Sequence, residues 1–87
     1  MEGIAILGLA AGTITSITFV PQVIKIWQTR SAKDLSVVML LLLLLGVSMW
    51  LTYGILVRDI AIIYTNSMVM AMGLVMLYFK WRFSKNG

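Results

Sequence analysis

Three long stretches of this sequence carry no charged side chain, and they constrain the fold more than any other feature. They are Gly3–Ile24, Val37–Val57 and Ile60–Phe79. Each is roughly 20 residues long, the length that a helix needs to cross the hydrocarbon core of a bilayer. A soluble domain of 87 residues cannot bury a composition that is 61% hydrophobic and only 11% charged. The sequence therefore predicts an all-α membrane protein with three transmembrane helices.

The spans leave room only for short ends and two short loops. We expect the helices at about residues 3–26, 37–57 and 60–82, in a single domain that covers residues 1–87. Asp34 or Ser36 is placed to cap the second helix, and Asp59 to cap the third. The first stretch lacks a basic leader and is long for a signal peptide, so we expect it to remain as a span.

Basic residues are concentrated on one side of the predicted bundle. The first loop and the C-terminus hold Lys25, Arg30, Lys33, Lys80, Arg82 and Lys85, whereas the second loop holds only Arg58. Because basic loops tend to stay in the cytoplasm, we expect the N-terminus outside and the C-terminus inside. This bias explains the net charge of +4 without a nucleic-acid partner, and it predicts that all copies insert in one direction. Aromatic residues near the cytoplasmic ends should lie at the membrane interface: Trp27, Tyr78, Trp81 and Phe83.

The residues that are missing narrow the function. The chain has no cysteine and no histidine, so disulfides, thiolate metal sites and the commonest general base are excluded. No nucleophile–base pair or metal-ligand set is visible, so we expect neither an enzyme nor a cofactor or metal. The spans also lack the ionisable residues that proton relays and ion-coupled carriers usually need. Any transport by this chain should therefore be downhill, and the one alternative is coupling to Na⁺ bound by backbone carbonyls, which needs no charged side chain.

Pro21, the only proline, lies late in the first span and is followed by Gln22. A proline inside a helix cannot donate to the carbonyl four residues back, here that of Ile17. Nearby hydroxyls and Gln22 are available as other donors to that carbonyl. The pair marks a place where the first helix can bend. In the same span, Gly8, Gly12 and Ser16 form a small-residue stripe whose simplest use is close helix packing.

Two uncharged polar side chains are predicted at the same depth in the membrane. Trp50 lies six residues before Leu56, near the end of the second span, and Asn66 lies six residues after Ile60, the start of the third. Both should therefore be about 9 Å from the outer surface, on antiparallel helices. Alone, Trp50 could be a packed core aromatic and Asn66 an interhelical hydrogen bond. Together, an indole face beside an amide suits a neutral, hydroxyl-rich ligand such as a sugar.

A three-helix chain with Pro21-Gln22 late in the first helix, Trp50 in the second and Asn66 in the third resembles the SemiSWEET family. These are bacterial PQ-loop sugar transporters, related to the SWEETs, and the resemblance covers essentially the whole chain. It implies a parallel homodimer of three plus three helices in the bacterial inner membrane, with the sugar on the twofold axis between Trp50 and Asn66 of both copies. Three helices alone have too few interior faces to surround a disaccharide, which independently favours two copies.

The resemblance also implies roles for the residues around the pocket. Pro21 with Gln22 matches the hinge that lets the first helix bend. Tyr53, Arg58 and Asp59 match the outer gate, and Met39 with Phe19 matches the inner gate.

The function that we expect is uncoupled, bidirectional facilitated diffusion of a mono- or disaccharide of the sucrose and glucose class, by alternating access. One alternative is a small exporter of lipophilic cations, but this would need a carboxylate within the membrane. The other is a non-transporting membrane subunit that binds a larger complex through the small-residue stripe. Sugar flux by the purified protein alone distinguishes these functions.

Overall fold

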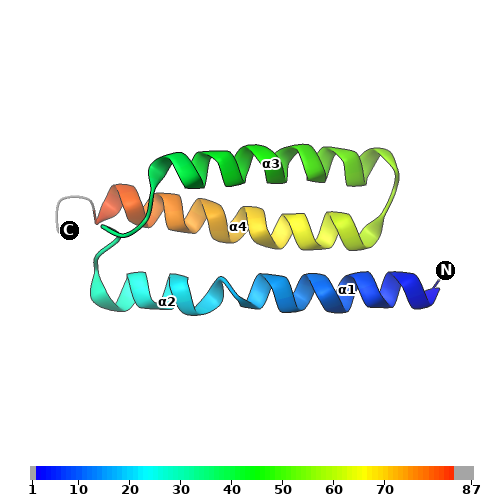
Figure 1. The fold of residues 1–87 in the computed structure, drawn as a ribbon, viewed down its shortest axis with the longest axis horizontal. Helices are drawn as coiled ribbons and strands as arrows, with labels where there is room; N and C mark the ends of the chain where they lie inside the picture. The colour runs from blue at the N-terminus through cyan, green and yellow to red at the C-terminus, as the bar shows by residue number, and fades with distance from the viewer. Residues whose placement is uncertain (1, 84–87) are drawn as a thin grey trace.

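The structure is a computed structural model that describes residues 2–83. The helices are α1 (Glu2–Ile17), α2 (Val20–Thr29), α3 (Val37–Leu56) and α4 (Ile60–Arg82). The first two follow one another along nearly the same axis (Figure 1) and together form one span, Gly3–Thr29. With α3 and α4, this gives three helical segments that are long and apolar enough to cross a membrane, as predicted.

The first span is interrupted immediately before Pro21. α1 ends in tight i→i−3 hydrogen bonds, from Thr18 N–H to the Thr15 carbonyl (3.2 Å) and from Phe19 N–H to the Ser16 carbonyl (3.1 Å). Pro21 then occupies the first turn of α2, where a helix needs no proline N–H. Within residues 2–83, none of the nearby hydroxyls donates to the Ile17 carbonyl. Thr18 Oγ1, for example, donates to the Thr15 carbonyl at 2.6 Å. The predicted bend is therefore a break between two helices.

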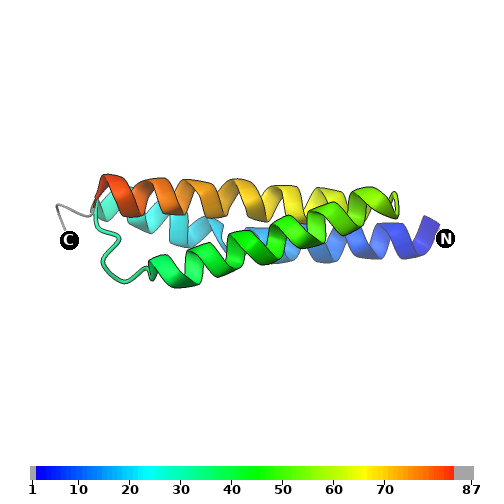
Figure 2. The ribbon, with the colours of Figure 1, turned by 90° about the horizontal axis from the view of Figure 1, so that it is seen from above.

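α4 lies between the first span and α3, and contacts both of them (Figure 1). α1 and α3 do not touch one another within residues 2–83. The principal-axis extents are 49 × 21 × 13 Å, and from above the spans overlap in a narrow band (Figure 2). The three spans thus form a layer with α4 in the middle, and they do not surround a common interior that could enclose a ligand.

The small-residue stripe packs α1 against α4. A Cβ atom on Gly8 would lie 2.7 Å from Ala61 Cβ, and one on Gly12 would lie 2.9 Å from Thr65 Cβ. Ser16 is only 3% exposed and donates to the Gly12 carbonyl at 2.8 Å. The stripe therefore serves close helix contact, the simplest of its predicted uses.

The turn between α3 and α4 is very short, and hydrogen bonds of its two charged residues, Arg58 and Asp59, stabilise it. Asp59 N–H bonds the Gly54 carbonyl (2.9 Å) and Arg58 N–H bonds the Ile55 carbonyl (3.2 Å), the pattern of a Schellman motif. Arg58 has the left-handed φ of 57° that this motif requires. The Asp59 carboxylate then caps α4 by accepting from two first-turn amides at 3.0 and 3.1 Å. The predicted Asp59 cap is confirmed. We call this end of the layer the turn end.

The buried core lies at the opposite end, which we call the loop end because the α2–α3 loop (residues 30–36) lies there. Its fully packed members come from α2, the loop, α3, α4 and the residue after α4: Ile26, Ala32, Leu40, Met76 and Phe83. Phe83 is 4% exposed and stacks on Phe79 at 5.3 Å. Its predicted place in the interfacial aromatic belt is therefore wrong, because the α2–α3 loop folds over this ring. Ser36 caps α3 by accepting from Met39 N–H at 3.1 Å, as predicted.

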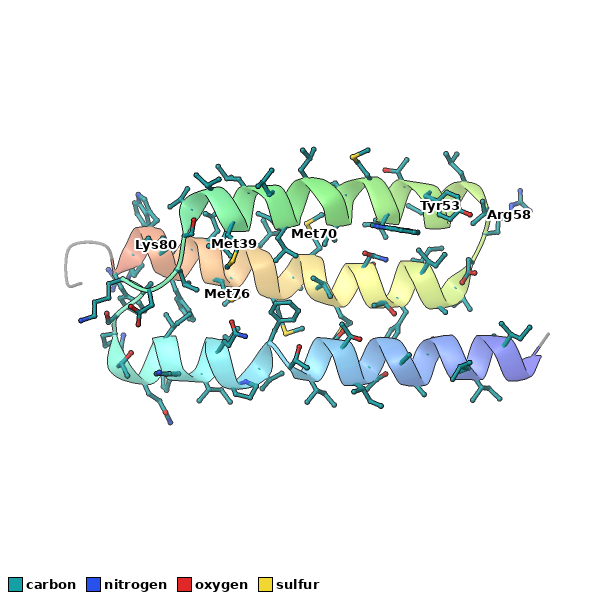
Figure 3. All side chains as sticks on the ribbon, in the orientation of Figure 1. Met39, Tyr53, Arg58, Met70, Met76 and Lys80 are labelled. Atoms are coloured by element: carbon teal, nitrogen blue, oxygen red, sulfur yellow. The ribbon has the colours of Figure 1, made fainter. Side chains whose placement is uncertain are left out.

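The α2–α3 loop is tied to the end of α4. Lys80 Nζ donates to the Ala32 carbonyl at 2.9 Å, and Figure 3 shows Lys80 beside the loop. The Arg30 guanidinium lies 5.4 Å from the Trp27 ring centroid and 5.7 Å from that of Phe83, within cation–π range. The end of α4 therefore holds the loop and α2 together as one packed unit.

Candidate functional site: the Trp50–Asn66 layer

The packing of α3 on α4 sets the level of Trp50 and Asn66. A Cβ atom on Gly54 would lie 2.6 Å from Ile62 Cγ2, so these two positions are opposite one another on antiparallel helices. Trp50 is four residues before Gly54, and Asn66 is four residues after Ile62. Both therefore lie about one helical turn further toward the middle of the layer. The register brings the indole and the amide to the same level.

Trp50 is not a core side chain of this chain. It is 57% exposed although it lies well inside a span. Its ring meets that of Tyr53 at 90°, with the centroids 5.6 Å apart. Together with Met49, the two rings line an open hollow of about 290 Å³. The interpretation of Trp50 as a packed core aromatic therefore does not hold within one chain.

Met39 shows which side of α3 carries Trp50. The two residues are eleven positions apart, which is about three helical turns, so they lie on the same side of α3. Met39 lines a cavity of about 450 Å³ at the loop end, together with Gln22 and Ile26 of α2. That side of α3 therefore faces α2, and Trp50 lies on the side that looks toward the first span across α4.

Asn66 does not join two helices. Its side chain is half-buried, and its Nδ2 donates to the Ile62 carbonyl of its own helix at 2.9 Å. Within residues 2–83, its Oδ1 accepts no hydrogen bond. Asn66 therefore does not form the interhelical hydrogen bond that was one of its two predicted roles. Its amide is oriented by α4 and keeps an acceptor for another group.

The cavity at the loop end contains one predicted hinge residue and one predicted inner-gate residue. Gln22 and Met39 line it, and Lys25, Lys33 and Asp34 are the charged groups around it. Phe19 does not belong to this lining. It is half-buried and packs against the core at the start of α2. The structure therefore separates the two residues predicted for the inner gate.

The residues predicted for the outer gate gather at the turn end. Figure 3 shows Tyr53 and Arg58 there, with the Arg58 side chain pointing away from the helices. Arg58 forms no ion pair with any residue between 2 and 83, and Oδ1 of the Asp59 carboxylate accepts both hydrogen bonds of the α4 cap. Among the same residues, no cluster of three metal-ligating side chains forms.

Sequence reasoning missed two features around this layer. Thr13 Oγ1 and Tyr64 OH are 2.8 Å apart and join α1 to α4 directly beside the Gly12–Thr65 contact. Tyr64 lies two positions before Asn66, but its hydroxyl partner depends on the α1–α4 register, which the sequence does not give. Met49 was missed because an apolar residue in an apolar helix carries no sign of the surface that it lines.

Comparisons with known proteins place the chain among transporters. Residues 3–61 match the family described as PQ loop repeat. The chain is 40% identical to the sugar transporter SemiSWEET of Bradyrhizobium diazoefficiens, over 92% of this chain and 93% of that protein. It is 35% identical to the SemiSWEET of Leptospira biflexa, over 86% and 88%. These relatives are named as transporters and not as enzymes.

Two solved structures of transporters also resemble this chain. A crystal structure of SemiSWEET in the inward-open conformation superposes with a TM-score of 0.88 and 32% identity, over 99% of this chain and 92% of that one. A bacterial homologue of SWEET transporters superposes with a TM-score of 0.86 and 32% identity, over 91% and 95%. The family match, the sequence relatives and the fold agree: this chain is a multi-pass membrane protein of the PQ-loop repeat family, and within that family it belongs to the SemiSWEETs.

Proposed function

We propose that this protein carries neutral sugars across a membrane as a parallel homodimer. The observation that carries the proposal is the common level of Trp50 and Asn66 in a chain whose three spans do not surround a common interior. Trp50 offers an exposed aromatic face, and Asn66 keeps a free acceptor. A second copy on the open side of the layer would supply the missing wall and a second Trp50–Asn66 pair. The SemiSWEET relatives are sugar transporters by name, which supports this substrate class.

Transport is uncoupled, bidirectional and of the facilitated-diffusion type. The spans carry no charge between Gly3 and Ile24, Val37 and Val57, or Ile60 and Phe79. Nothing there provides the titratable group that a proton-coupled carrier usually needs. We infer a mono- or disaccharide of the sucrose and glucose class, because the pocket pairs aromatic surface with uncharged hydrogen-bonding groups.

Alternating access uses the two ends of the layer in turn. Tyr53, Arg58 and Asp59 close the turn end, which we assign to the outside because the loop end holds most of the basic residues. The N-terminus is then periplasmic and the C-terminus cytoplasmic, in a bacterial inner membrane. At the cytoplasmic end, Met39 closes the cavity that Gln22 also lines.

Movement between the two states pivots at the break before Pro21. Phe19 lies within this break and packs against the core, so it would transmit the movement rather than block the path. The hinge residues are thus Pro21 and Gln22, and Phe19 is the weaker member of the proposed inner gate.

The test is radiolabelled sugar flux into proteoliposomes that contain only the purified protein. Trp50→Ala and Asn66→Ala should each lower flux at least tenfold. Trp27→Ala, another exposed tryptophan, and Ser67→Ala, the exposed neighbour of Asn66, are the matched controls and should transport normally. Flux should not change when proton or sodium gradients are imposed. Full transport by both pocket variants would rule out this site, and no flux from the wild type would favour the non-transporting subunit.

A further inference from the structure

The rings of Tyr53 and Trp50 meet at a right angle, and we call this pair the aromatic corner. Their rings stand at 90° with centroids 5.6 Å apart, and both side chains are more than half exposed, at 51% and 57%. Tyr53 is the turn-end member of the pair. Met49 completes the lining of the hollow of about 290 Å³ between them and the open side of α3.

The polar atoms of this corner have no partner within the chain. Neither the Tyr53 hydroxyl nor the Trp50 indole N–H forms a hydrogen bond with any residue between 2 and 83. A phenol and an indole at membrane depth normally have a hydrogen-bond partner, because lipid offers none. The partner must therefore come from outside the chain, and the hollow is an open space that both residues line.

A pyranose has two kinds of surface, and the corner has a wall for each. The C–H face of the sugar ring is apolar and can lie flat on one aromatic ring. Its rim carries hydroxyls, which must be hydrogen-bonded once water is removed. If the C–H face of the sugar lies on the Trp50 ring, the Tyr53 ring, which stands at a right angle to it, lies beside the hydroxyls of the sugar. The phenolic hydroxyl can both donate and accept there.

We propose that Tyr53 is a specificity-determining residue: its hydroxyl bonds one particular hydroxyl of a sugar stacked on Trp50. The inference rests on the proposed function and deepens it, because it assigns Tyr53 to the pocket as well as to the outer gate. Tyr53 would then contact the sugar directly, which couples occupancy of the pocket to closure of the turn end.

The test compares Tyr53→Phe with the wild type across a set of sugars. D-glucose, sucrose and the monodeoxy analogues of glucose are used as competitors of labelled sugar in proteoliposome exchange, and the apparent affinity of each is measured. One neutral hydrogen bond corresponds to about a five- to tenfold change in affinity. Tyr53→Phe should weaken the parent sugar by this factor and leave one deoxy analogue unchanged, namely the analogue that lacks the recognised hydroxyl.

Control variants separate recognition from gating and folding. Tyr78→Phe removes a hydroxyl from another exposed tyrosine, far from the pocket, and should match the wild type for every sugar. Tyr53→Leu removes the whole wall and should weaken all sugars. A gating defect in Tyr53→Phe would change the maximal rate for all sugars alike, without altering their order of affinity.

Each outcome decides a different claim. A selective loss that disappears with one deoxy analogue supports the inference. If Tyr53→Phe has no effect, or weakens every sugar by the same factor, the hydroxyl does not recognise sugar and the inference is overturned while the proposed function stands. If the wild type neither binds nor carries any sugar of the set, the proposed function fails together with the inference.

Discussion

Replacement of Arg58 by glycine should stabilise this protein. Arg58 is the left-handed residue of the α3–α4 turn, with φ of 57°. An L-residue with a side chain pays roughly 1–2 kcal/mol for this conformation, whereas glycine pays almost nothing. Glycine also makes the unfolded chain more flexible, which costs about 0.4–1 kcal/mol. The Arg58 side chain is exposed and forms no ion pair within residues 2–83, so its loss removes little else. The net expectation is a gain of about 0.5–1 kcal/mol.

The measurement is the free energy of unfolding in mixed micelles, from reversible titration with a denaturing detergent followed by helical circular dichroism. Arg58→Ala removes the same charge but keeps the strained φ, so it should show no gain. Arg30→Gly also relieves a left-handed residue, with φ of 56°, but loses the contacts of the guanidinium with Trp27 and Phe83. Its gain should therefore be smaller. If Arg58→Gly is no more stable than Arg58→Ala, backbone strain is not stored at this turn.

Two further predictions concern the first span. Gly12→Ala should lower the free energy of unfolding by about 1–3 kcal/mol, because its Cβ would press on Thr65 across the α1–α4 contact. Gly46→Ala is the control, since a Cβ there meets nothing within 4 Å, and equal effects in both variants would contradict the packing argument. Pro21→Ala restores an N–H that can donate to the Ile17 carbonyl and join α1 to α2, so sugar flux into proteoliposomes should fall. Unchanged flux would remove Pro21 from the mechanism.

The strain at Arg58 bears on why the turn has its present sequence. A glycine would satisfy the Schellman motif better, and Asp59 alone supplies both the last amide of the motif and the cap of α4. An arginine at a left-handed position favours a use for its side chain, in agreement with its proposed place in the outer gate. An exposed pair with a neighbouring carboxylate is worth only about 0–1 kcal/mol. So weak a contact suits the proposed outer gate, which would have to reopen in every transport cycle.

Features that depend on local sequence could be predicted, and those that depend on which helices meet could not. The three spans follow from hydropathy, and the Ser36 and Asp59 caps from residue type at a helix start. The break before Pro21 was expected only as a bend, because the tight bonds that end α1 arise from the preceding residues. Phe83 was misplaced because its burial depends on the α2–α3 loop folding back over α4.

In the Trp50–Asn66 layer, too, some features could be predicted from local sequence and others depend on how the helices pack. Its depth could be counted from the helix ends, since both residues lie at fixed distances from the short α3–α4 turn. The side of α3 that carries Trp50 could not be predicted, because α3 is apolar all round and its pattern does not mark a buried face. Contact of Gly54 with Ile62, and the cavity that Met39 shares with α2, supply that information. Among apolar residues such as Met39, Met49 and Phe19, only the packed structure distinguishes a lining residue from a core residue.

The two halves of the first span are attached to α4 in different ways, and this limits how the protein can move. α1 is held by glycine contacts and the Thr13–Tyr64 hydrogen bond, whereas α2 is held by the core at the loop end. α4 runs unbroken beside both. Swinging α2 away from α4 would expose core side chains such as Ile26 and Phe83 near the water interface, at about 1.5–3 kcal/mol each.

Swinging α2 away from α4 would also break the hydrogen bond from Lys80 Nζ to the Ala32 carbonyl in the loop. A movement that keeps α2, the loop and the end of α4 together avoids both the exposure of core side chains and the loss of the Lys80 hydrogen bond. In such a movement, the contacts that change are those between the two copies. A pivot at Pro21 can then tilt this packed unit as a whole relative to α1, provided that α4 flexes at the same level. The residues of α4 at that level, near Gly73, pack closely on Leu44 of α3, with 2.9 Å between a glycine Cβ position and Leu44 Cδ2. Glycine lowers the resistance of a helix to bending, so the break in the first span and Gly73 in α4 would together allow the tilt that the proposed alternating access needs.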